Sequence, residues 1–236
     1  THYGIGTRMM ALHEHNERDI TAGLLRHLAA GEDIALVSDA GTPLISDPGF
    51  YLVRAAREAQ VRVVPVPGAS ALVAALSVAG LPSDRFLFEG FLPSKQAARR
   101  QRLQELAAVT VTLVVYESSH RICASLRDMV ECLGGDREAT VARELTKTFE
   151  TLLHGSLGEL LQRVESDADQ QKGEFVVLIH GAVLAERSVV DTETLRMLDM
   201  MLAELPLKQA AGLLAKISGL SKNMLYDEGL KLKQQR

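Results

Sequence analysis

Two loops rich in glycine and other small residues each stand between a short apolar run and a helical segment. The first, residues 38–49 (SDAGTPLISDPG), follows the run at 34–37, and the second, residues 67–71 (PGASA), follows the run at 62–66. Such loops at the carboxyl ends of strands bind ligands, because glycine permits close backbone approach and the next helix presents free N–H groups. The carboxylate of Asp39 can accept hydrogen bonds from a ribose hydroxyl or an ammonium group. By spacing alone, ordinary turn geometry is the alternative for both loops.

Polar side chains also gather after two apolar runs in the second half of the chain. Residues 116–121 (YESSHR) follow the β-branched run at 110–116, and residues 142–147 (ARELTK) follow the run at 139–143. Each segment combines acids and bases where a strand is predicted to end. The alternative is a pair of ordinary surface loops, but two such loops at strand exits favour a functional site.

Other chemistries fit the residues less well. Gly41 stands where a phosphatase pattern would need a second acid, and residues 68–72 (GASAL) lack the last glycine of a nucleophile elbow. No phosphate-binding P-loop is present. His13 and His15 would share one face of a strand, but no cysteine or further histidine lies near them, so we expect no metal site.

The elements that must position these residues alternate between strand and helix in the first part of the chain, which predicts an α/β domain with a parallel sheet. Helices are expected at 19–30, 49–59 and 70–79, and strands at 34–37 and 62–66.

After the segment LPSD at 81–84, successive strands need not all be joined by helices, which predicts a mixed sheet. Strands are expected at 86–88, 110–116, 139–143, 149–154 and 173–181, and helices at 94–107, 119–133 and 156–166.

Residues 191–236 are predicted to be helical, with a glycine turn at Gly219 between two helices. This gives three domains: an α/β domain at 1–82, a second α/β domain at 83–186 and a helix-turn-helix-like tail at 187–236. A packing or dimerisation appendage is the alternative for the tail.

Composition places the chain among globular proteins of ordinary make-up. It has 236 residues, of which 47% are hydrophobic. No apolar run reaches the length of a membrane span, so we expect no membrane association. Cys123 and Cys132, nine residues apart on one predicted helix, face different directions and cannot bridge within it, which favours reduced thiols in the cytosol.

The charge distribution is uneven. The formal net charge of −4 argues mildly against a nucleic-acid partner. Residues 94–102 nevertheless contain four Lys or Arg and no acid, and residues 204–236 contain six Lys or Arg against three acids. Both clusters are candidate RNA contacts, with a solvated face as the alternative for each.

Several long segments together resemble one protein family. They are residues 37–49 (VSDAGTPLISDPG), 65–71 (PVPGASA), 79–93 (AGLPSDRFLFEGFLP), 116–121 (YESSHR), 142–147 (ARELTK), 172–181 (KGEFVVLIHG) and the helical tail at 203–230. In this order they resemble the bacterial 16S rRNA (cytidine-2′-O)-methyltransferases, the ribosomal RNA small subunit methyltransferase I family of the tetrapyrrole-methylase superfamily. The similarity covers almost the whole chain.

The resemblance implies a tetrapyrrole-methylase-like α/β fold, with two αβα domains, a parallel sheet followed by a mixed sheet, and a C-terminal helical tail. It implies a cytoplasmic homodimer that uses S-adenosylmethionine, without a metal, to methylate the ribose 2′-hydroxyl of a cytidine in 16S rRNA. Carried over by motif, the cofactor-binding residues are Asp39, Gly41, Thr42, Pro43, Leu44, Ser70, Ala71, Tyr116, Ala142, Val176 and Val177.

The chain departs from the family at its start. The family begins with a strand and a glycine-containing loop, for which this sequence has no counterpart. We therefore expect residues 1–236 alone to bind the cofactor poorly, with an affinity weaker than micromolar by calorimetry.

Methyl transfer to a ribose hydroxyl needs in-line positioning, and it benefits from a base and from a cation that stabilises the developing alkoxide. The candidate bases are Glu117, Glu144 and Glu89, with His120 as a further candidate. The candidate cations are Arg121, Lys147 and Arg143. Because Glu117 and Arg121 stand four residues apart, a simple ion pair is the alternative for them.

The candidate RNA contacts are Lys95, Arg99, Arg100, Arg102, Arg143, Lys208 and Lys222. An assembled small ribosomal subunit is the expected acceptor, because a few basic patches can dock only on a shaped surface. Two alternatives stay open: a small-molecule or protein methyltransferase of the same fold, and a non-catalytic RNA-binding protein.

Overall fold

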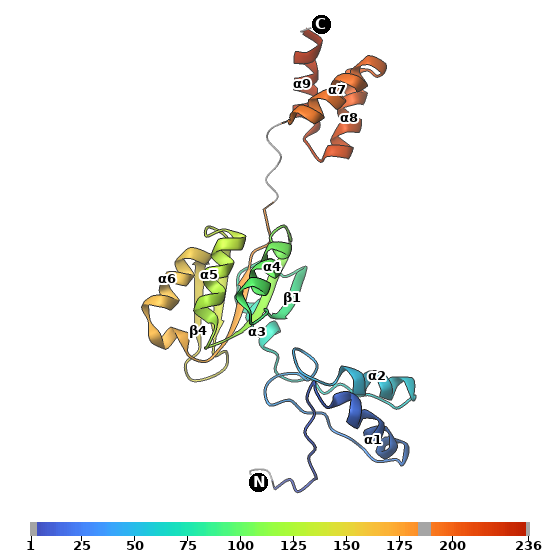
Figure 1. Cartoon of the computed structure of the whole chain (residues 1–236), viewed down its shortest axis with the longest axis vertical. Coiled ribbons are helices and arrows are strands. Elements are labelled where there is room, and N and C mark those ends of the chain that lie inside the picture. The colour runs from blue at the N-terminus through green and yellow to red at the C-terminus, as the bar shows by residue number, and fades with distance from the viewer. Residues whose placement is uncertain (1–3, 184–189, 235–236) are drawn as a thin grey trace. The chain divides into compact units, whose positions relative to one another are not determined.

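The computed structural model describes residues 4–183 and 190–234 of the chain (Figure 1). The chain divides into two compact units, residues 1–181 and 182–236. The predicted start of the tail at residue 187 lies outside the described residues.

The first unit is built around a five-stranded mixed sheet with the order β1-β2-β5-β3-β4. Strand β1 (Phe86–Phe91) is parallel to β2 (Thr112–Ser118). Strand β5 (Glu174–Ile179) is antiparallel to both its neighbours, β2 and β3 (Glu138–Arg143), and β3 is antiparallel to β4 (Thr151–Ser156). The mixed sheet predicted from the sequence is confirmed.

Helices cover the two faces of the sheet unequally (Figure 1). Helices α4 (Gln96–Leu106), α5 (Ile122–Leu133) and α6 (Leu157–Ser166) pack on one face and enclose the larger core. Among the described helices, α3 (Ala71–Val78) packs on the other face. Because α3 precedes the predicted boundary at 82–83 and packs on the sheet that follows it, the chain on the two sides of that boundary shares a core.

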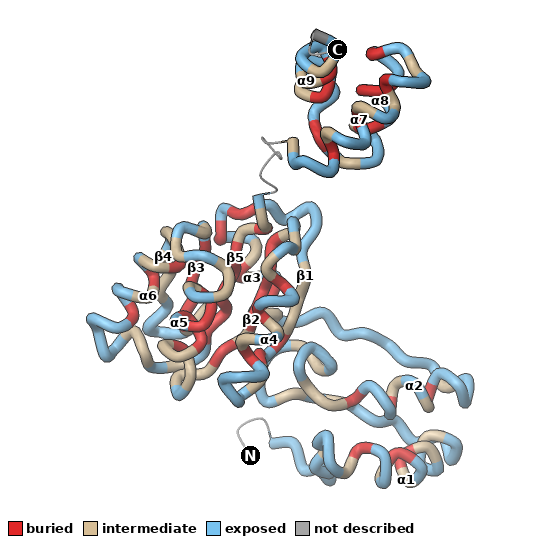
Figure 2. The backbone as a smooth tube through the Cα atoms, turned by 45° about the horizontal axis from the view of Figure 1, so that its top comes forward, coloured by how far each residue is buried: buried red, intermediate tan, exposed pale blue. Residues whose placement is uncertain are grey.

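Side chains alternate between the two faces, as strand geometry requires. Val141 and Val177 are buried against the α4–α6 layer, whereas Ala142 and Val176 are buried beneath α3. Figure 2 shows this buried core in the sheet and in the helices that cover it, and shows that the N-terminal segment is largely exposed.

The N-terminal segment contains the predicted helices but not the predicted strands. Helices α1 (Glu17–Ala29) and α2 (Phe50–Glu58) lie where the apolar spacing placed them. They are joined by the buried Glu17, whose Oε1 accepts the backbone N–H groups of Tyr51 and Leu52 at 2.8 and 3.2 Å. This carboxylate satisfies two of the free donors at the start of α2.

The predicted strands at 34–37 and 62–66 are wrong, because neither segment forms a strand. A parallel strand needs a hydrogen-bonded neighbour on at least one side, and neither segment has one within the described part of the chain. The exposed fractions of Val37 and Val66 are accordingly 77% and 86%.

The second unit contains three helices in its described part: α7 (Thr192–Glu204), α8 (Leu207–Ser218) and α9 (Lys222–Gln234). They share a core of leucines and alanines, including Leu198, Leu214 and Leu225. Gly219 ends α8 with a φ of 73°, the left-handed conformation that favours glycine at this position. The predicted helices and the glycine turn between the last two are confirmed.

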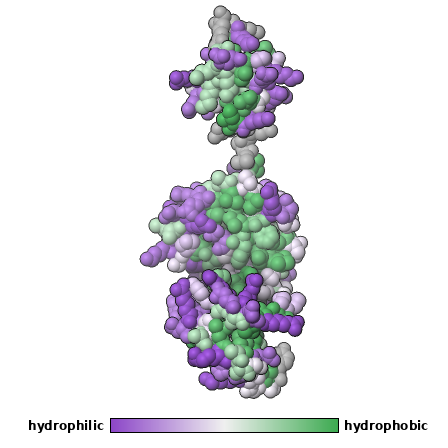
Figure 3. Space-filling view, turned by 90° about the vertical axis from the view of Figure 1, so that its right-hand side faces the viewer, coloured by the Kyte–Doolittle hydropathy of each residue, from purple (hydrophilic) through white to green (hydrophobic). Residues whose placement is uncertain are grey.

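Two further features of the described residues are the state of the cysteines and the character of the helices. Cys123 and Cys132 are both free thiols. Within the described residues, no helix combines the length and the apolar character that crossing a bilayer requires. Figure 3 shows apolar surface exposed on one face of the first unit. The exposed large apolar side chains of this unit include Val73, Phe86 and Phe91.

Replacing Arg137 with alanine should lower the free energy of unfolding by about 2–3 kcal/mol. Its half-buried guanidinium donates to three backbone carbonyls, those of Ala107, Val109 and His180, at 3.0, 3.2 and 2.7 Å. The change would leave these carbonyls without their donor. Urea unfolding followed by circular dichroism would measure the effect. Arg127→Ala removes only an exposed ion pair and should change stability by less than about 1 kcal/mol, and equal losses in both variants would contradict this assignment.

Candidate functional site

The two glycine loops predicted from the sequence lie side by side. Thr42, in the first loop, donates its hydroxyl to the carbonyl of Ala69, in the second, at 2.9 Å. Gly41 has a φ of 77°, and a Cβ built on it would lie 3.8 Å from the same carbonyl. Thr42 therefore fixes the position of one loop against the other.

The first loop also contacts strand β1. A Cβ built on Gly90 would lie 3.0 Å from the hydroxyl of Ser46, and Gly90 follows a register irregularity in the β1–β2 pairing. Leu44 and Ser46 have φ values of 72° and 61°, in the left-handed region that residues other than glycine seldom adopt. Backbone conformations of this kind cluster at ligand-binding sites, where the surrounding structure holds them in place.

Tyr116 connects strand β2 to the second loop. Its hydroxyl accepts the backbone N–H of Leu72 at 3.0 Å, at the beginning of α3. Its ring packs edge-on against Phe88 and Phe91, with ring centroids 4.9 and 5.8 Å away. Burial raises the pKa of the Tyr116 phenol, although the hydrogen bond from Leu72 lowers it in part. The phenol therefore remains protonated at neutral pH and holds the helix start against the sheet.

The predicted cofactor residues fall into two groups. Asp39, Gly41, Leu44 and Ala71 are exposed along the two loops, with Thr42, Pro43, Ser70 and Tyr116 half-buried beside them. Ala142 and Val176 are sealed beneath α3. The side chain of Val177 lies on the opposite face, buried against the α4–α6 layer, because strand side chains alternate.

The two polar segments predicted after strands also meet, at one edge of the sheet. Ser118, at the end of β2, pairs with Glu174, at the beginning of β5, and Arg143, at the end of β3, pairs with Phe175. Antiparallel β5 thus brings the segments 116–121 and 142–147 to the same edge. It also brings there residues 172–174 of the KGEF motif.

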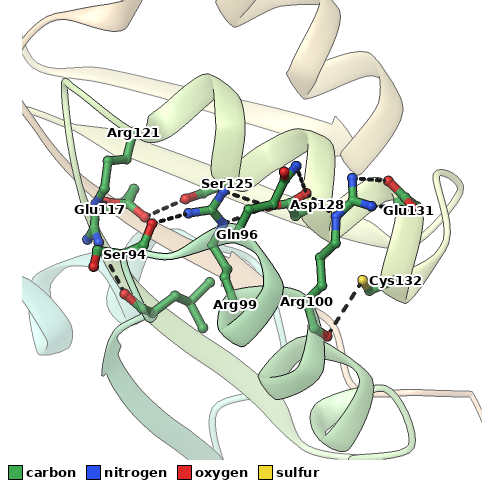
Figure 4. A network of polar contacts seen from close by, with 11 residues as sticks. Ser94, Gln96, Arg99, Arg100, Glu117, Arg121, Ser125, Asp128, Glu131 and Cys132 are labelled. Carbon is green, nitrogen blue, oxygen red and sulfur yellow. Dashed lines mark hydrogen bonds and ion pairs between the residues drawn. The ribbon is translucent and has the colours of Figure 1, made fainter.

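At this edge Glu117 is buried and fully engaged (Figure 4). Its Oε1 accepts the N–H of Ser118 at 2.8 Å and Nε of Arg121 at 2.9 Å, and its Oε2 accepts the hydroxyl of Ser125 at 2.6 Å. Arg121 also donates Nη1 to the carbonyl of Leu92, just beyond β1, at 3.2 Å. Glu117 therefore fixes Arg121, which links the ends of two parallel strands.

Arg143 and Glu144 bind neighbouring backbone. The buried Arg143 donates to the carbonyls of Lys172 and Phe149 at 2.7 and 3.1 Å, so its guanidinium is already used within the fold. Glu144 Oε1 accepts the N–H of Glu174 and the ammonium of Lys147, at 2.9 and 2.8 Å. These two hydrogen bonds lower the pKa of Glu144.

Gly173 explains why the KGEF motif has a glycine beside this cluster. Its φ is 97°, and a Cβ at this position would lie 2.5 Å from Cγ of Glu144. The ARELTK and KGEF motifs therefore pack directly against each other, and we call this contact the Glu144–Gly173 clamp.

The basic stretch at 94–102 is largely neutralised in the fold. Arg102 donates Nε and Nη2 to the two carboxylate oxygens of Glu89, at 2.6 and 2.9 Å. Arg99 and Arg100 both bind Asp128 of α5, each with Nε at 2.7 Å from an Asp128 oxygen (Figure 4). Of the four predicted RNA contacts in this stretch, only Lys95 is exposed without a carboxylate partner in the described part of the chain.

Sequence reasoning missed two buried polar residues of α5. Asp128 binds Arg99 and Arg100, and Ser125 donates its hydroxyl to Glu117. Asp128 is fully buried, and burial raises its pKa, but hydrogen bonds from Arg100, Gln96 and Arg99 outweigh burial and lower it overall. A polar residue on the apolar face of a predicted helix was the signal that could have indicated it. Among the described residues, no group of three or more His, Cys, Asp or Glu side chains could hold a metal ion.

Comparison with protein families gives two matches. The tetrapyrrole (corrin/porphyrin) methylase family matches residues 3–161, and the RsmI C-terminal HTH domain matches residues 188–233. Among solved structures, the methyltransferase CobJ has a TM-score of 0.52 at 21% identity over 70% of this chain and 72% of that chain. Diphthine synthase has a TM-score of 0.52 at 16% identity over 74% of this chain and 70% of that chain. These two structures establish similarity of fold alone.

Curated relatives are much more similar in sequence. The ribosomal RNA small subunit methyltransferase I of Pseudomonas aeruginosa is 56% identical over 97% of this chain and 82% of that protein. The proteins of the same name from Vibrio cholerae and Escherichia coli O157:H7 are 53% and 52% identical, each over 97% of this chain and 80% of the relative. The chain therefore belongs to the ribosomal RNA small subunit methyltransferase I family, within the tetrapyrrole methylases.

Proposed function

We propose that this protein transfers a methyl group from S-adenosylmethionine to the ribose 2′-hydroxyl of a cytidine in 16S rRNA of the small ribosomal subunit. The observation that carries the proposal is identity of 52–56% over 97% of the chain to proteins named ribosomal RNA small subunit methyltransferase I. The choice of cytidine and of the 2′-hydroxyl rests on the motif resemblance. A protein that modifies the ribosome must act in the cytoplasm. The same resemblance supports a homodimer.

The two glycine loops would hold S-adenosylmethionine. The exposed Asp39 carboxylate would accept hydrogen bonds from hydroxyl or ammonium groups of the cofactor. A Cβ built on Gly68 would meet no atom within 4 Å, so the backbone there is open to a ligand. Gly41 and Ala71 would likewise let the cofactor lie against the main chain. When bound, the cofactor supplies a methyl group already activated by the sulfonium charge.

The chain must orient the ribose hydroxyl and accept its proton. Glu117, Glu144 and Glu89 each have carboxylate oxygens engaged by an arginine or a lysine, so we assign them positioning roles. A base must come within hydrogen-bond reach of the hydroxyl. His120, exposed in the same loop as Arg121, is the remaining candidate, and we propose it as the base.

Contacts to the RNA would then come from exposed cations. Lys95 beside the sheet edge and Lys208 and Lys222 in the C-terminal unit are exposed and suited to phosphate contacts. Arg121 and Lys147, which are partly occupied by carboxylates, would position the acceptor through the loops they hold.

Methyl transfer from labelled S-adenosylmethionine to small ribosomal subunits from a strain lacking this activity tests the proposal. Nuclease digestion of the product would locate the label, which we expect on a 2′-O-methylated cytidine. Cofactor binding without label on the RNA would point to a small-molecule or protein acceptor. RNA binding without cofactor binding would indicate a non-catalytic RNA-binding protein.

Replacing Asp39 with alanine should weaken cofactor binding by about 10- to 100-fold, because a charge-assisted hydrogen bond contributes roughly 1.5–3 kcal/mol. Isothermal calorimetry on the wild type and the variant would give the ratio of dissociation constants. Asp33→Ala, in the same N-terminal segment but before the first loop, is the matched control and should leave the affinity unchanged. An Asp39 variant that binds as the wild type does would remove this residue from the site.

A further inference from the structure

Charge is segregated within the C-terminal unit. Helix α7 with its N-cap carries four acids (Asp191, Glu193, Asp199 and Glu204) against one arginine. Helices α8 and α9 carry five lysines (Lys208, Lys216, Lys222, Lys231 and Lys233) against two acids. The first helix of the unit is therefore acidic and the last two are basic, although the summed charge of the three helices is close to zero.

Two of the lysines share one face of α8. Lys208, Gly212 and Lys216 follow one another at intervals of four residues, which aligns them along the helix at a rise of about 6 Å per step. Lys208 and Lys216 are exposed, and α8 contains no acidic residue. The absence of a side chain at Gly212 leaves the middle of this face open.

A third lysine reaches the same place from the next helix. A Cβ built on Gly212 would lie 3.6 Å from Cε and 3.8 Å from Nζ of Lys222, the first residue of α9. The Lys222 ammonium thus lies over Gly212, the residue midway between Lys208 and Lys216 along α8. The turn at Gly219 makes this approach possible, because it returns the chain toward α8.

None of these three ammonium groups forms an ion pair within the described residues. Lys231, farther along α9, is by contrast paired with Glu228 at 2.7 Å. Like charges gathered on one face repel each other unless an anion binds between them. The lysine triad, defined as Lys208, Lys216 and Lys222 around Gly212, is therefore poised for an anionic partner.

We infer that the lysine triad binds the phosphate backbone of ribosomal RNA, with successive ammonium groups on successive phosphates. RNA is favoured over an acidic protein surface because a strand presents a regular row of charges, as the triad does. Phosphate contacts orient the partner and carry no sequence information. The inference rests on the proposed function for the identity of the RNA, and it assigns the C-terminal unit the role of docking it.

The salt dependence of binding tests the inference directly. For the whole chain on naked 16S rRNA, the triple variant K208Q/K216Q/K222Q should reduce the slope of log K against log salt concentration by about 2–3. Lys231→Gln, which removes a paired lysine of the same unit, is the matched control and should leave the slope unchanged. An unchanged slope in the triple variant, or an equal reduction in the control, would overturn the inference.

A second variant pair separates charge from folding. Gly212→Glu places a carboxylate four residues from both Lys208 and Lys216, and we expect it to weaken RNA binding about tenfold. Gly212→Gln, of the same size but neutral, should change binding far less. Both residues favour a helix more than glycine does, so a loss confined to the Glu variant is not a loss of folding. Equal binding by both variants would contradict the inference.

The result is independent of the catalytic proposal. A reduced slope without any methyl transfer would keep RNA docking and remove the proposed activity. Methyl transfer together with an unchanged slope in the triple variant would keep the proposed activity and remove RNA docking by the lysine triad. If the wild type and the triple variant bound naked RNA equally and differed only in binding assembled subunits, the inference would be overturned in favour of an acidic protein surface.

Discussion

Replacing Asp128 with alanine should lower the free energy of unfolding by about 3–5 kcal/mol, the loss typical when one member of a buried ion pair is removed. The Asp128 side chain is 0% exposed and the Arg99 side chain only 5%. Asp128 accepts hydrogen bonds from Arg99, Arg100 and Gln96, all on α4. Without this carboxylate, the Arg99 guanidinium stays buried with no opposite charge, and the α4–α5 contact loses its polar anchor.

Urea unfolding of the wild type and the variant would measure this loss. Glu131→Ala removes an exposed partner of Arg100 while leaving Asp128 in place, so it should change stability by less than about 1 kcal/mol. A similar small effect for Asp128→Ala would show that the buried network does not stabilise the fold.

The same carboxylate predicts a pH dependence. Because the folded-state pKa of Asp128 is lowered, its stabilising contribution is present above the unfolded pKa, about 3.9, and is lost as the pH falls through the folded value. The stability difference between the wild type and Asp128→Ala should therefore be full at neutral pH and shrink as the pH falls below about 4. A difference that stays constant down to pH 2 would contradict the assignment.

Replacing Glu117 with glutamine should lower kcat for methyl transfer by about 100-fold, the order expected when a positioned group is displaced by roughly 1 Å. The carboxylate holds Arg121, the N–H of Ser118 and the hydroxyl of Ser125. The amide presents a donor where one of these donors now binds, so Arg121 and the loop end at Leu92 must move. KM for the cofactor should change little, because these hydrogen-bond partners of Glu117 lie outside the glycine loops.

The pH profile of this variant separates positioning from proton transfer. If Glu117 only positions Arg121, the methyl-transfer rate of the Gln variant still falls at acidic pH as in the wild type, but it is lower at every pH. If Glu117 is instead the general base, the variant loses that fall in rate at acidic pH. Glu105→Gln, which changes a carboxylate exposed on α4, serves as the control and should leave both the rate and the profile unaltered.

Local patterns were sufficient to predict most elements of the fold. Residues 110–116 are rich in β-branched side chains and form β2, and the apolar spacing at 19–30 and 156–166 corresponds to α1 and α6. The runs at 34–37 and 62–66 had the same local character as true strands. They remain unpaired because strand formation depends on a neighbour, which local sequence does not encode.

Charge was harder to interpret than periodicity. Residues 94–102 contain no acid, yet Arg99 and Arg102 are neutralised by Asp128 and Glu89, which lie on other elements. The two ends of the Glu144–Gly173 clamp are likewise separated by almost thirty residues of sequence. Motifs could identify these residues, but only the fold distinguishes side chains that hold the structure from side chains that face a ligand.

The position of β5 in the sheet has a consequence for synthesis of the protein on the ribosome. This strand pairs on both sides, with β2 and β3, and it is the last of the five in sequence. Until it emerges, the pairs β1–β2 and β3–β4 each present an unpaired edge, and such edges promote aggregation. Nascent chains that stall before β5 has emerged from the ribosome should therefore depend on chaperones, whereas chains that have exposed residue 179 can close the sheet.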